Sequence, residues 1–347
     1  MRIAFFVYPS AFQTPGGGEI FLLKTKETLQ KKGVYVKLFN QWEDKLTDFD
    51  ILHVFGSVKD CLGLMRTAKN IGTKVALSPV FWSTLQRSWN EYGTLPKKLK
   101  MVAQHATKAA FPIAPSARRE MMALSDILLP NSHAEADQVA RYFKISKKKM
   151  RVIYLGVDER FAKSNPALFK NRYNIDKFIL SVGRFEPRKN QLNLIKALKG
   201  FKMPLVFIGS AAAGYEEYLS ECKKNADKST IFIERVDHED KLLASAYAAS
   251  ELFVLQSWLE TPGLVALEAG LAGTRLAVTE AGSTREYFKN YVEYLDPVST
   301  QSIRGAIERE LSKEKNDKLK EYILKNFLWS SVADENIKVY KELMGSK

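Results

Sequence analysis

The sequence predicts two consecutive α/β domains, each built on a parallel β-sheet. Short apolar, β-prone runs alternate with longer amphipathic segments along the whole chain. This alternation restarts near the middle, and 347 residues are enough for two hydrophobic cores. The stretch 251–282 reads as strand, helix and strand, which is a βαβ unit and implies parallel strands.

In the first half, the glycine-rich loop YPSAFQTPGGG separates a first strand from a helix over 19–32 that ends at Gly33. The aromatic and polar segment SPVFWSTLQRSWNEYG has no clear periodicity and is expected to be an acceptor-side loop. Buried strands are expected at 2–7, 34–39, 51–54, 75–78, 127–130 and 152–155.

The second half repeats the pattern, with strands expected at 178–182, 204–208, 230–233, 252–256 and 276–279. Helices are expected over 191–198 and 240–250. A further helix is expected to begin with Thr261 as its cap and Pro262 in its first turn, and to end at Gly273. The interdomain connection is placed between residues 165 and 166.

Two glutamates flank this last helix, Glu260 just before it and Glu268 two turns into it. Along a helix axis they lie roughly 9 to 12 Å apart, which suits one extended ligand with hydroxyls at both ends and negative charge between them. The free N–H groups of Gly263 and Leu264 would face that charge. The alternative is a capped structural helix with two solvated glutamates.

The E-x7-E spacing, followed by AGLAG, resembles the donor-site signature of family 4 retaining glycosyltransferases, which have the GT-B fold. Four further segments resemble the family in order along the chain: GGGE at 16–19, LLPNSHAEAD at 128–137, VIYLGVDERF at 152–161 and SVGRFEPRKN at 181–190. The resemblance implies two Rossmann-like doubly wound α/β domains facing a central cleft. Residues 1–165 would form the acceptor-side domain, 166–328 the domain that binds the nucleotide-sugar donor, and 329–347 a helix that crosses back to the first domain.

The resemblance also implies the residues that would carry the chemistry. Arg184 and Lys189 resemble the family's diphosphate-binding pair, and together with Glu260 they are the expected catalytic residues. Two cations at the leaving group make a metal unnecessary, so neither a metal nor another cofactor is expected. Arg188 lies beside the pair but is expected to point elsewhere.

By the same resemblance, Glu260 would accept hydrogen bonds from the donor sugar and Glu268 from the ribose. Gly17 and Gly18 would lie over the donor diphosphate and the acceptor, although a plain flexible turn is the alternative reading of GGGE. Position 236, a valine, is expected to contact the base through its backbone. The Gly263 and Leu264 amides would meet the diphosphate or the sugar.

Two features depart from the family pattern. Many relatives carry a His or Arg near the anomeric carbon, where this chain has Pro79 and Val80. His53 and His105 are the candidates to replace it in space, although a lone histidine is more often structural. The Phe of the family's E-G-F-G is also absent, and Pro262 stands there.

Composition points to a globular, cytoplasmic protein. Hydrophobic residues make up 46% and charged residues 27%, and no apolar run reaches the ~18 residues of a membrane span. The N-terminus enters a strand rather than a signal peptide, and the two cysteines, Cys61 and Cys222, have no metal or redox spacing.

The net charge of +14 is concentrated in residues 1–163, which carry +12. Such a surplus favours an anionic partner, for which a peripheral position at the inner face of the plasma membrane is considered, or else it is a solvated surface with no partner. The lysine-flanked segment 95–111, with Leu99, Val102, Ala103 and Ala106 at helical spacing, is either a membrane-surface helix or an ordinary amphipathic helix. No motif that stacks nucleic-acid bases accompanies the charge, so no nucleic-acid partner is expected.

These observations predict a retaining hexosyltransferase that uses a UDP-sugar or GDP-sugar and a saccharide or lipid-linked acceptor, as in polysaccharide or glycolipid biosynthesis. The alternatives are a nucleotide-sugar epimerase or a phosphorylase of the same fold, and a non-catalytic subunit that binds ligand or membrane only. An epimerase needs no second substrate, and a phosphorylase needs a pyridoxal-binding lysine motif, which the sequence lacks.

Overall fold

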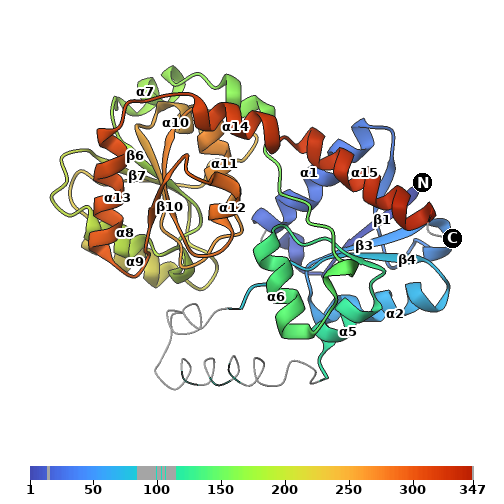
Figure 1. The fold of residues 1–347 in the computed structure, drawn as a ribbon. Coiled ribbons are helices and arrows are strands. Elements are labelled where there is room, and N and C mark those ends of the chain that lie inside the picture. The colour runs from blue at the N-terminus through green and yellow to red at the C-terminus, as the bar shows by residue number, and fades with distance from the viewer. Residues whose placement is uncertain (14–15, 84–98, 100–102, 104–105, 107–114, 346–347) are drawn as a thin grey trace. The chain divides into compact units, whose positions relative to one another are not determined.

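The computed structural model describes residues 1–13, 16–83, 99, 103, 106 and 115–345, which form two compact α/β units (Figure 1). Unit 1 comprises 1–83, 115–156 and 329–345, and unit 2 comprises 157–328. The boundary expected at 165/166 therefore lies inside unit 2. The reason is that η5 (Glu159–Lys163) packs on unit 2, where the Phe161 ring centre lies 5.8 Å from that of Tyr247.

Within the described residues, unit 1 has a parallel sheet in the order β2-β1-β3-β4-β5. Its strands are β1 (Arg2–Val7), β2 (Tyr35–Leu38), β3 (Ile51–Phe55), β4 (Lys74–Ser78) and β5 (Ile127–Leu128). Its α-helices are α1 (Gly17–Lys31), α2 (Leu62–Asn70), α5 (Ala117–Leu124), α6 (His133–Phe143) and α15 (Trp329–Gly345). Short 3-10 helices are η1 (Ala11–Gln13), η2 (Leu46–Asp48), η3 (Lys59–Cys61) and η4 (Lys147–Lys149).

Two expectations for unit 1 differ from the structure. The strand expected at 152–155 is wrong, because residues 151–156 form no strand. The neighbouring strand β5 has only two residues to pair with. The segment is therefore held to it by single hydrogen bonds, such as that from the Ile153 N–H to the Pro130 carbonyl, at 3.0 Å. Helix α1 begins earlier than expected, at Gly17, because the Glu19 carboxylate accepts the Gly16 N–H at 2.7 Å and closes the first turn.

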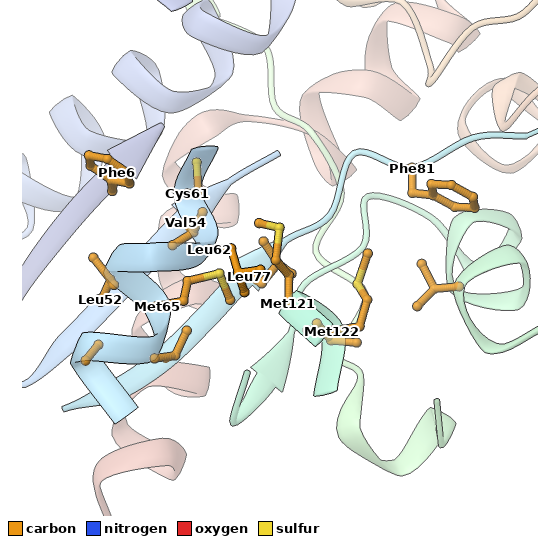
Figure 2. Packing of buried hydrophobic residues seen from close by; sticks show 14 of the residues in the cluster. Phe6, Leu52, Val54, Cys61, Leu62, Met65, Leu77, Phe81, Met121 and Met122 are labelled. Atoms are coloured by element: carbon orange, nitrogen blue, oxygen red, sulfur yellow. The ribbon is translucent and has the colours of Figure 1, made fainter. Parts of the chain in front are cut away.

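Apolar side chains alternate along the strands of unit 1 and pack against helices on both faces of its sheet. Leu52 and Val54 of β3 and Leu77 of β4 meet Met65 of α2 and Met121 of α5, and all five are fully buried (Figure 2). Helices α1 and α15 contact each other in the same unit (Figure 1). The segment 329–345 therefore completes the fold of unit 1 although it follows unit 2 in sequence.

Two buried ionisable side chains in unit 1 serve its structure. His53 bonds the Tyr340 hydroxyl through Nδ1 at 2.7 Å and Ser78 Oγ through Nε2 at 3.0 Å, and burial lowers its pKa to about 3. It is therefore a neutral bridge between the sheet and α15. Glu135 accepts the N–H groups of Phe81 at 2.8 Å and Asn131 at 2.7 Å, while burial raises its pKa to about 7.

Within the described residues, unit 2 has a parallel sheet in the order β11-β10-β9-β6-β7-β8. Its strands are β6 (Ile179–Val182), β7 (Leu205–Ile208), β8 (Ile231–Ile233), β9 (Leu252–Leu255), β10 (Arg275–Thr279) and β11 (Glu293–Leu295). Its α-helices are α7 (Ala167–Tyr173), α8 (Gln191–Ala197), α9 (Glu216–Asn225), α10 (Lys241–Ala249), α11 (Leu264–Leu271), α12 (Thr284–Phe288), α13 (Thr300–Ser312) and α14 (Lys318–Asn326). The 3-10 helix η6 (Pro187–Lys189) precedes α8.

The core of unit 2 is likewise layered. Leu194 of α8, Cys222 of α9 and Ile303 of α13 are fully buried in one cluster with strand residues such as Leu252 and Ala277. The five strands expected from the sequence in this half are confirmed within one residue at each end. Strand β11 was not expected, because its residues, Glu293 to Leu295, include a glutamate and form no apolar run.

Two expected features fall mainly outside the described residues: most of the aromatic loop 78–93, and the lysine-flanked segment 95–111. Both cysteines are free and buried, Cys61 in unit 1 and Cys222 in unit 2. None of the helices in the described part of the chain combines the length and the apolar character that a bilayer crossing needs.

We expect Gly156→Ala to destabilise unit 1. A Cβ at this position would lie 2.6 Å from Cδ2 and Cε3 of Trp329 and 2.9 Å from its Cα, and Trp329 is a buried residue stacked on Phe21. Overpacking of this kind typically lowers the free energy of unfolding by roughly 1 to 3 kcal/mol. Urea denaturation followed by circular dichroism measures it.

The matched control is Gly63→Ala in α2, where an added Cβ meets nothing within 4 Å. Alanine is favoured over glycine in a helix by about 1 kcal/mol, so this variant should be as stable as the wild type or more stable. Equal denaturation midpoints for the two variants would contradict the close packing of Trp329 on Gly156.

Candidate functional site

The site of unit 2 lies where the strand order of its sheet reverses. Strands β7 and β8 continue to one side of β6, whereas β9, β10 and β11 continue to the other. Loops that leave the carboxyl ends of neighbouring strands separate at such a point, and ligands of open α/β sheets bind there. The loop after β6 carries Arg184 and Lys189, and the loop after β9 carries Glu260.

Glycines allow the loop after β6 to lie against the loop after β7. Gly183 and Gly209 have φ of +152° and +155°, values at which a side chain is strained. A Cβ on Gly209 would lie 2.1 Å from the Gly183 carbonyl oxygen, so the two backbones are in direct contact. The Phe185 N–H then bonds the Ser210 carbonyl at 2.9 Å, which fixes the start of the Arg184 loop.

Buried amides fix the end of the same loop. Asn190 donates through Nδ2 to the carbonyls of Gln256, at 3.1 Å, and of Pro297, at 2.8 Å. Gln256 in turn donates through Nε2 to the Lys189 carbonyl at 2.8 Å, and its Oε1 accepts from Ser181 Oγ at 3.2 Å. The backbone of Lys189 is therefore tied to the end of β9, and its side chain is directed by a rigid support.

Lys189 and Glu260 form a short ion pair. Lys189 Nζ lies 2.5 Å from Glu260 Oε1, and the two side chains are 16% and 8% exposed. Arg188 also faces this carboxylate, with NH1 3.9 Å from Oε1, while its NH2 bonds Glu186 at 2.8 Å. The expectation that Arg188 points elsewhere is therefore wrong, because the tight turn of η6 brings both neighbouring cations toward Glu260.

The charges of this group determine its ionisation. Burial would raise the pKa of Glu260, but the charges of Lys189 and Arg188 outweigh it and hold the pKa below its ordinary value. Burial lowers the pKa of Lys189, and the nearby Glu260 carboxylate only partly offsets that effect. At neutral pH we take the pair as ionised.

The backbone at Glu260 is held by the loop after β10, and this changes the start of the next helix. The Glu260 N–H bonds the Ala281 carbonyl at 3.1 Å, and its carbonyl accepts the Ser283 N–H at 3.0 Å. Residues 260–262 therefore cannot enter the helix, and α11 begins at Leu264 with Gly263, φ +86°, as its cap. The cap expected at Thr261 is wrong, whereas the helix end before Gly273 is confirmed.

Glu268 lies in a second polar cluster. Its Oε2 accepts the Tyr247 hydroxyl at 2.9 Å, and its Oε1 lies 2.8 Å from His238 Nε2. The Glu268 residue is 5% exposed. The two glutamates expected to hold one ligand thus have different partners: a lysine for Glu260, and a tyrosine and a histidine for Glu268.

The remaining expected site residues are spread over both units. Arg184 is exposed, and its carbonyl accepts from Gln191 Nε2 at 2.8 Å. Val236 is half-buried in the loop after β8, two residues before His238. Gly17 and Gly18 lie in unit 1 at the start of α1, where a Cβ on Gly18 would meet nothing within 4 Å.

Leu264 is half-buried in the first turn of α11. Gly263 is buried beside Glu260, since an added Cβ would lie 3.5 Å from Glu260 Oε2 and 2.6 Å from Leu255 Cδ2. The first N–H groups of a helix have no acceptor within the helix, and α11 begins directly after Gly263.

Sequence reasoning missed Arg188, His238 and Tyr247. The signal for His238 was its place in a loop that follows a strand of the same sheet, next to the position assigned to the base. Tyr247 carried no such signal, because a tyrosine in an apolar helix is usually core. Its neighbour Glu268, buried by the fold, supplies the acceptor that its hydroxyl needs.

His53 does not replace the family's histidine, because it is fully engaged by Ser78 and Tyr340 inside unit 1. His105 lies outside the described residues. In the part of the chain that the structure describes, no three or more His, Cys, Asp or Glu side chains are grouped to hold a metal ion.

We expect Lys189→Ala to destabilise unit 2, because it removes the close cation of the buried Glu260 and leaves Arg188 3.9 Å away. Removing one partner of a buried ion pair costs about 3 to 5 kcal/mol. The loss should shrink as the pH falls and Glu260 takes up a proton. In the wild type, by contrast, stability falls as the pH falls. The pKa of Glu260 is lowered in the folded state, so its contribution to the free energy of unfolding is present above the ordinary pKa of 4.5 and is lost as the pH falls through the folded-state pKa.

Urea denaturation of both proteins near neutral pH and in mild acid measures these effects. Arg184→Ala removes a nearby but exposed cation and should change the free energy of unfolding by no more than about 0.5 kcal/mol. If Lys189→Ala and Arg184→Ala had the same free energy of unfolding near neutral pH, the buried Lys189–Glu260 pair would not stabilise unit 2.

Part of the chain is similar in sequence to known proteins. Residues 168–326 match the family model described as "Glycosyl transferases group 1". An uncharacterized glycosyltransferase, MJ1607, of Methanocaldococcus jannaschii is 28% identical over 236 residues, 60% of this chain and 59% of its own. The N-acetylgalactosamine-N,N'-diacetylbacillosaminyl-diphospho-undecaprenol 4-alpha-N-acetylgalactosaminyltransferase of Campylobacter jejuni is 28% identical over 168 residues, 47% of this chain and 44% of its own. The chain thus spans less than two thirds of the length of these relatives.

Solved structures resemble the whole chain. Sucrose-phosphate synthase of Thermosynechococcus elongatus matches with a TM-score of 0.79 at 16% identity, over 100% of both chains. Anabaena Alr3699/HepE in complex with UDP-glucose matches with a TM-score of 0.72 at 15% identity, over 99% of this chain and 100% of that one. The chain therefore has the GT-B fold, and its residues 168–326 carry the sequence pattern of the group 1 glycosyl transferases.

Proposed function

We propose that this protein is a retaining, metal-independent glycosyltransferase. It moves a hexose-type sugar from a nucleotide-diphosphate sugar to a saccharide or lipid-linked saccharide acceptor. The observation that carries the proposal is the buried Lys189–Glu260 pair at the point where the strand order reverses, inside the segment that matches the family model. A glycosyltransfer site needs this combination of a fixed cation for the leaving group and a carboxylate for sugar hydroxyls.

The leaving group is a nucleoside diphosphate, which gains negative charge as the anomeric C–O bond breaks. Arg184 can bind its oxygens through two N–H groups, and Lys189 supplies a point charge. The ammonium of Lys189 has three N–H donors, and the bond to Glu260 uses one of them. The ion pair therefore orients the lysine and leaves donors for phosphate. Arg188 adds a second positive charge on the same carboxylate.

Glu260 would bind the sugar of the donor, and the start of α11 would bind its diphosphate. The Lys189 bond uses Oε1 of Glu260, so Oε2 can accept a bond from a sugar hydroxyl. The N–H groups of the first turn of α11, at Leu264, carry the positive end of the helix dipole and suit the diphosphate. Glu268, deeper in the helix, would accept from the ribose.

Retention of configuration follows if the acceptor hydroxyl attacks from the face that the leaving group occupies. The departing phosphate oxygen then takes the proton of the acceptor hydroxyl, and a new C–O bond forms at the anomeric carbon. This route requires no nucleophile from the protein. With Arg184, Arg188 and Lys189 supplying positive charge, the charge of the leaving group can be stabilised without a divalent metal.

The acceptor class is proposed from two observations. Residues 1–163 hold nearly all of the net positive charge, which suits an acidic membrane surface or a phosphorylated lipid carrier. The name of the Campylobacter jejuni relative describes a sugar on diphospho-undecaprenol as its acceptor. We place the proposed activity in the cytoplasm, at the inner face of the plasma membrane, where such carriers would be met.

The competing candidate is a protein that binds a nucleotide sugar without transferring it. Two points favour it: the resemblance to family 4 implies a His or Arg where this chain has Val80, and His53 is occupied by Ser78 and Tyr340. The two candidates differ in turnover, since a transferase hydrolyses its donor slowly or transfers it to some member of an acceptor panel. A binding protein does neither.

Nucleotide binding tests the donor site directly. Calorimetric titration of UDP, GDP and ADP, each with and without Mg²⁺, should show one nucleotide binding in the micromolar range without metal. Arg184→Ala should weaken that binding by about tenfold or more, because a charged hydrogen bond contributes about 1.5 to 3 kcal/mol. Glu268→Gln should weaken it as well, because an amide is a poorer acceptor for the ribose.

Arg172→Ala is the matched control, because Arg172 is an exposed arginine of α7 in the same unit and outside the site. It should bind as the wild type does. The donor-site assignment fails if no nucleotide binds to the wild type, or if Arg184→Ala and Arg172→Ala bind alike. A requirement for Mg²⁺ would remove the metal-independent part of the proposal.

A further inference from the structure

The polar cluster around Glu268 contains a contact that the proposed function does not explain. Glu268 Oε1 lies 2.8 Å from His238 Nε2, and Oε2 accepts from Tyr247 at 2.9 Å. Both oxygens of the carboxylate that we assign to the ribose thus already have a protein partner.

Exposure distinguishes the two partners. Tyr247 is fully buried, whereas the His238 side chain is 20% exposed and that of Glu268 is 6% exposed. Of these three side chains, the imidazole is the one nearest to solvent. A hydroxyl that approaches Glu268 from outside therefore meets His238 first, while Tyr247 can remain bonded below.

The backbone of His238 is anchored by Arg160, which also contacts the ring. Arg160 NH2 donates to the His238 carbonyl oxygen at 2.5 Å, and Arg160 NH1 bonds Glu239 at 2.7 Å. On its other side the ring has looser contacts, with Nδ1 3.2 Å from both Arg160 NH2 and Glu239 Oε1. Because the anchor is on the carbonyl, the imidazole can turn away from Glu268 while the loop stays in place.

We propose that His238 is a gate on the ribose pocket of the donor site. Its imidazole occupies, on Glu268 Oε1, the position that a ribose hydroxyl takes in the bound state. Nucleotide binding replaces the Nε2–Oε1 hydrogen bond with a hydroxyl–carboxylate hydrogen bond. The inference rests on the proposed function and deepens it, because it adds a residue that controls access to the same site.

The exchange of partners on Glu268 is coupled to the release of a proton from His238. The groups that face His238 are Glu268 from α11, Glu239 from its own loop and Arg160 from η5, with the neutral Tyr247 hydroxyl of α10 on the far side of Glu268. Burial and the charge of Arg160 lower the pKa of His238, but Glu268, together with the hydrogen bond to Glu239, outweighs them, so the pKa is raised. When a ribose hydroxyl replaces His238 on Glu268, the carboxylate no longer stabilises the charged imidazole, which releases its proton. Binding should therefore strengthen as the pH rises through the pKa of His238.

The test is calorimetric titration of the full chain with the nucleotide, of UDP, GDP and ADP, that binds to it. Titrations at about pH 6 and about pH 8 should give wild-type affinity roughly three- to tenfold higher at the higher pH, since one pKa unit corresponds to tenfold. His238→Ala should bind more tightly than the wild type at about pH 6 and gain less affinity between the two pH values, keeping only the part that comes from ionisation of the nucleotide's terminal phosphate. His238→Gln keeps an N–H donor for Glu268 without a titrating group, so it should show the same reduced pH dependence and not gain affinity.

His133→Ala is the matched control, because it removes a histidine of α6 in unit 1 and should keep the wild-type pH dependence. A second readout needs no variant: the pKa of the His238 imidazole, followed by NMR, should fall on saturation with the nucleotide.

Three outcomes would overturn the inference. Weaker binding by His238→Ala at both pH values would mean that His238 orients Glu268 for the ligand, and an unchanged His238 pKa on saturation would mean that its bond persists. Either result leaves the proposed function standing, because the nucleotide still binds. Failure of all three nucleotides to bind to the wild type would instead remove the proposed function, and the gate with it.

Discussion

The cost of burying a carboxylate shapes the candidate site of unit 2. A carboxylate removed from water must have a cation or a hydrogen-bond donor beside it, and the fold provides different ones for its two glutamates. Glu260 is paired with Lys189, and Glu268 with Tyr247 and His238. The first arrangement leaves a fixed cation with spare donors, whereas the second leaves a partner that can be exchanged. The difference in partners gives the two glutamates different proposed roles.

The position of these groups follows from parallel strand order. In a parallel sheet the carboxyl ends of all strands meet at one edge, so loops distant in sequence converge there. Direct backbone contact tightens that edge in unit 2, since Gly209 touches the Gly183 carbonyl and a Cβ on Gly282 would lie 1.9 Å from the Glu260 carbonyl oxygen. Both contacts require glycine: the first sets the loop after β6 against the loop after β7, and the second sets the loop after β9 against the loop after β10.

Unit 1 uses the same physics for a different purpose. His53 is kept neutral by burial and joins the sheet to α15 through Tyr340. Glu135 holds the loop after β4 by accepting the Phe81 N–H, and burial keeps its pKa near 7. The hydrogen bonds of both groups are made within unit 1.

The sequence by itself determined the two α/β halves and ten of their strands, each within about two residues at its ends. It also determined the segments that carry Arg184, Lys189, Glu260 and Glu268. Both results follow because apolar periodicity and motif spacing are local properties of a chain. It did not determine which side chains pair. The strand expected at 152–155 and the cap expected at Thr261 were wrong, since each depends on a partner distant in the chain: a two-residue β5 in one case and the bonds of Glu260 to the 281–283 loop in the other. The contacts of Arg188, His238 and Tyr247 were decided only by tertiary structure, because the acceptor of each lies on an element between 21 and 72 residues away.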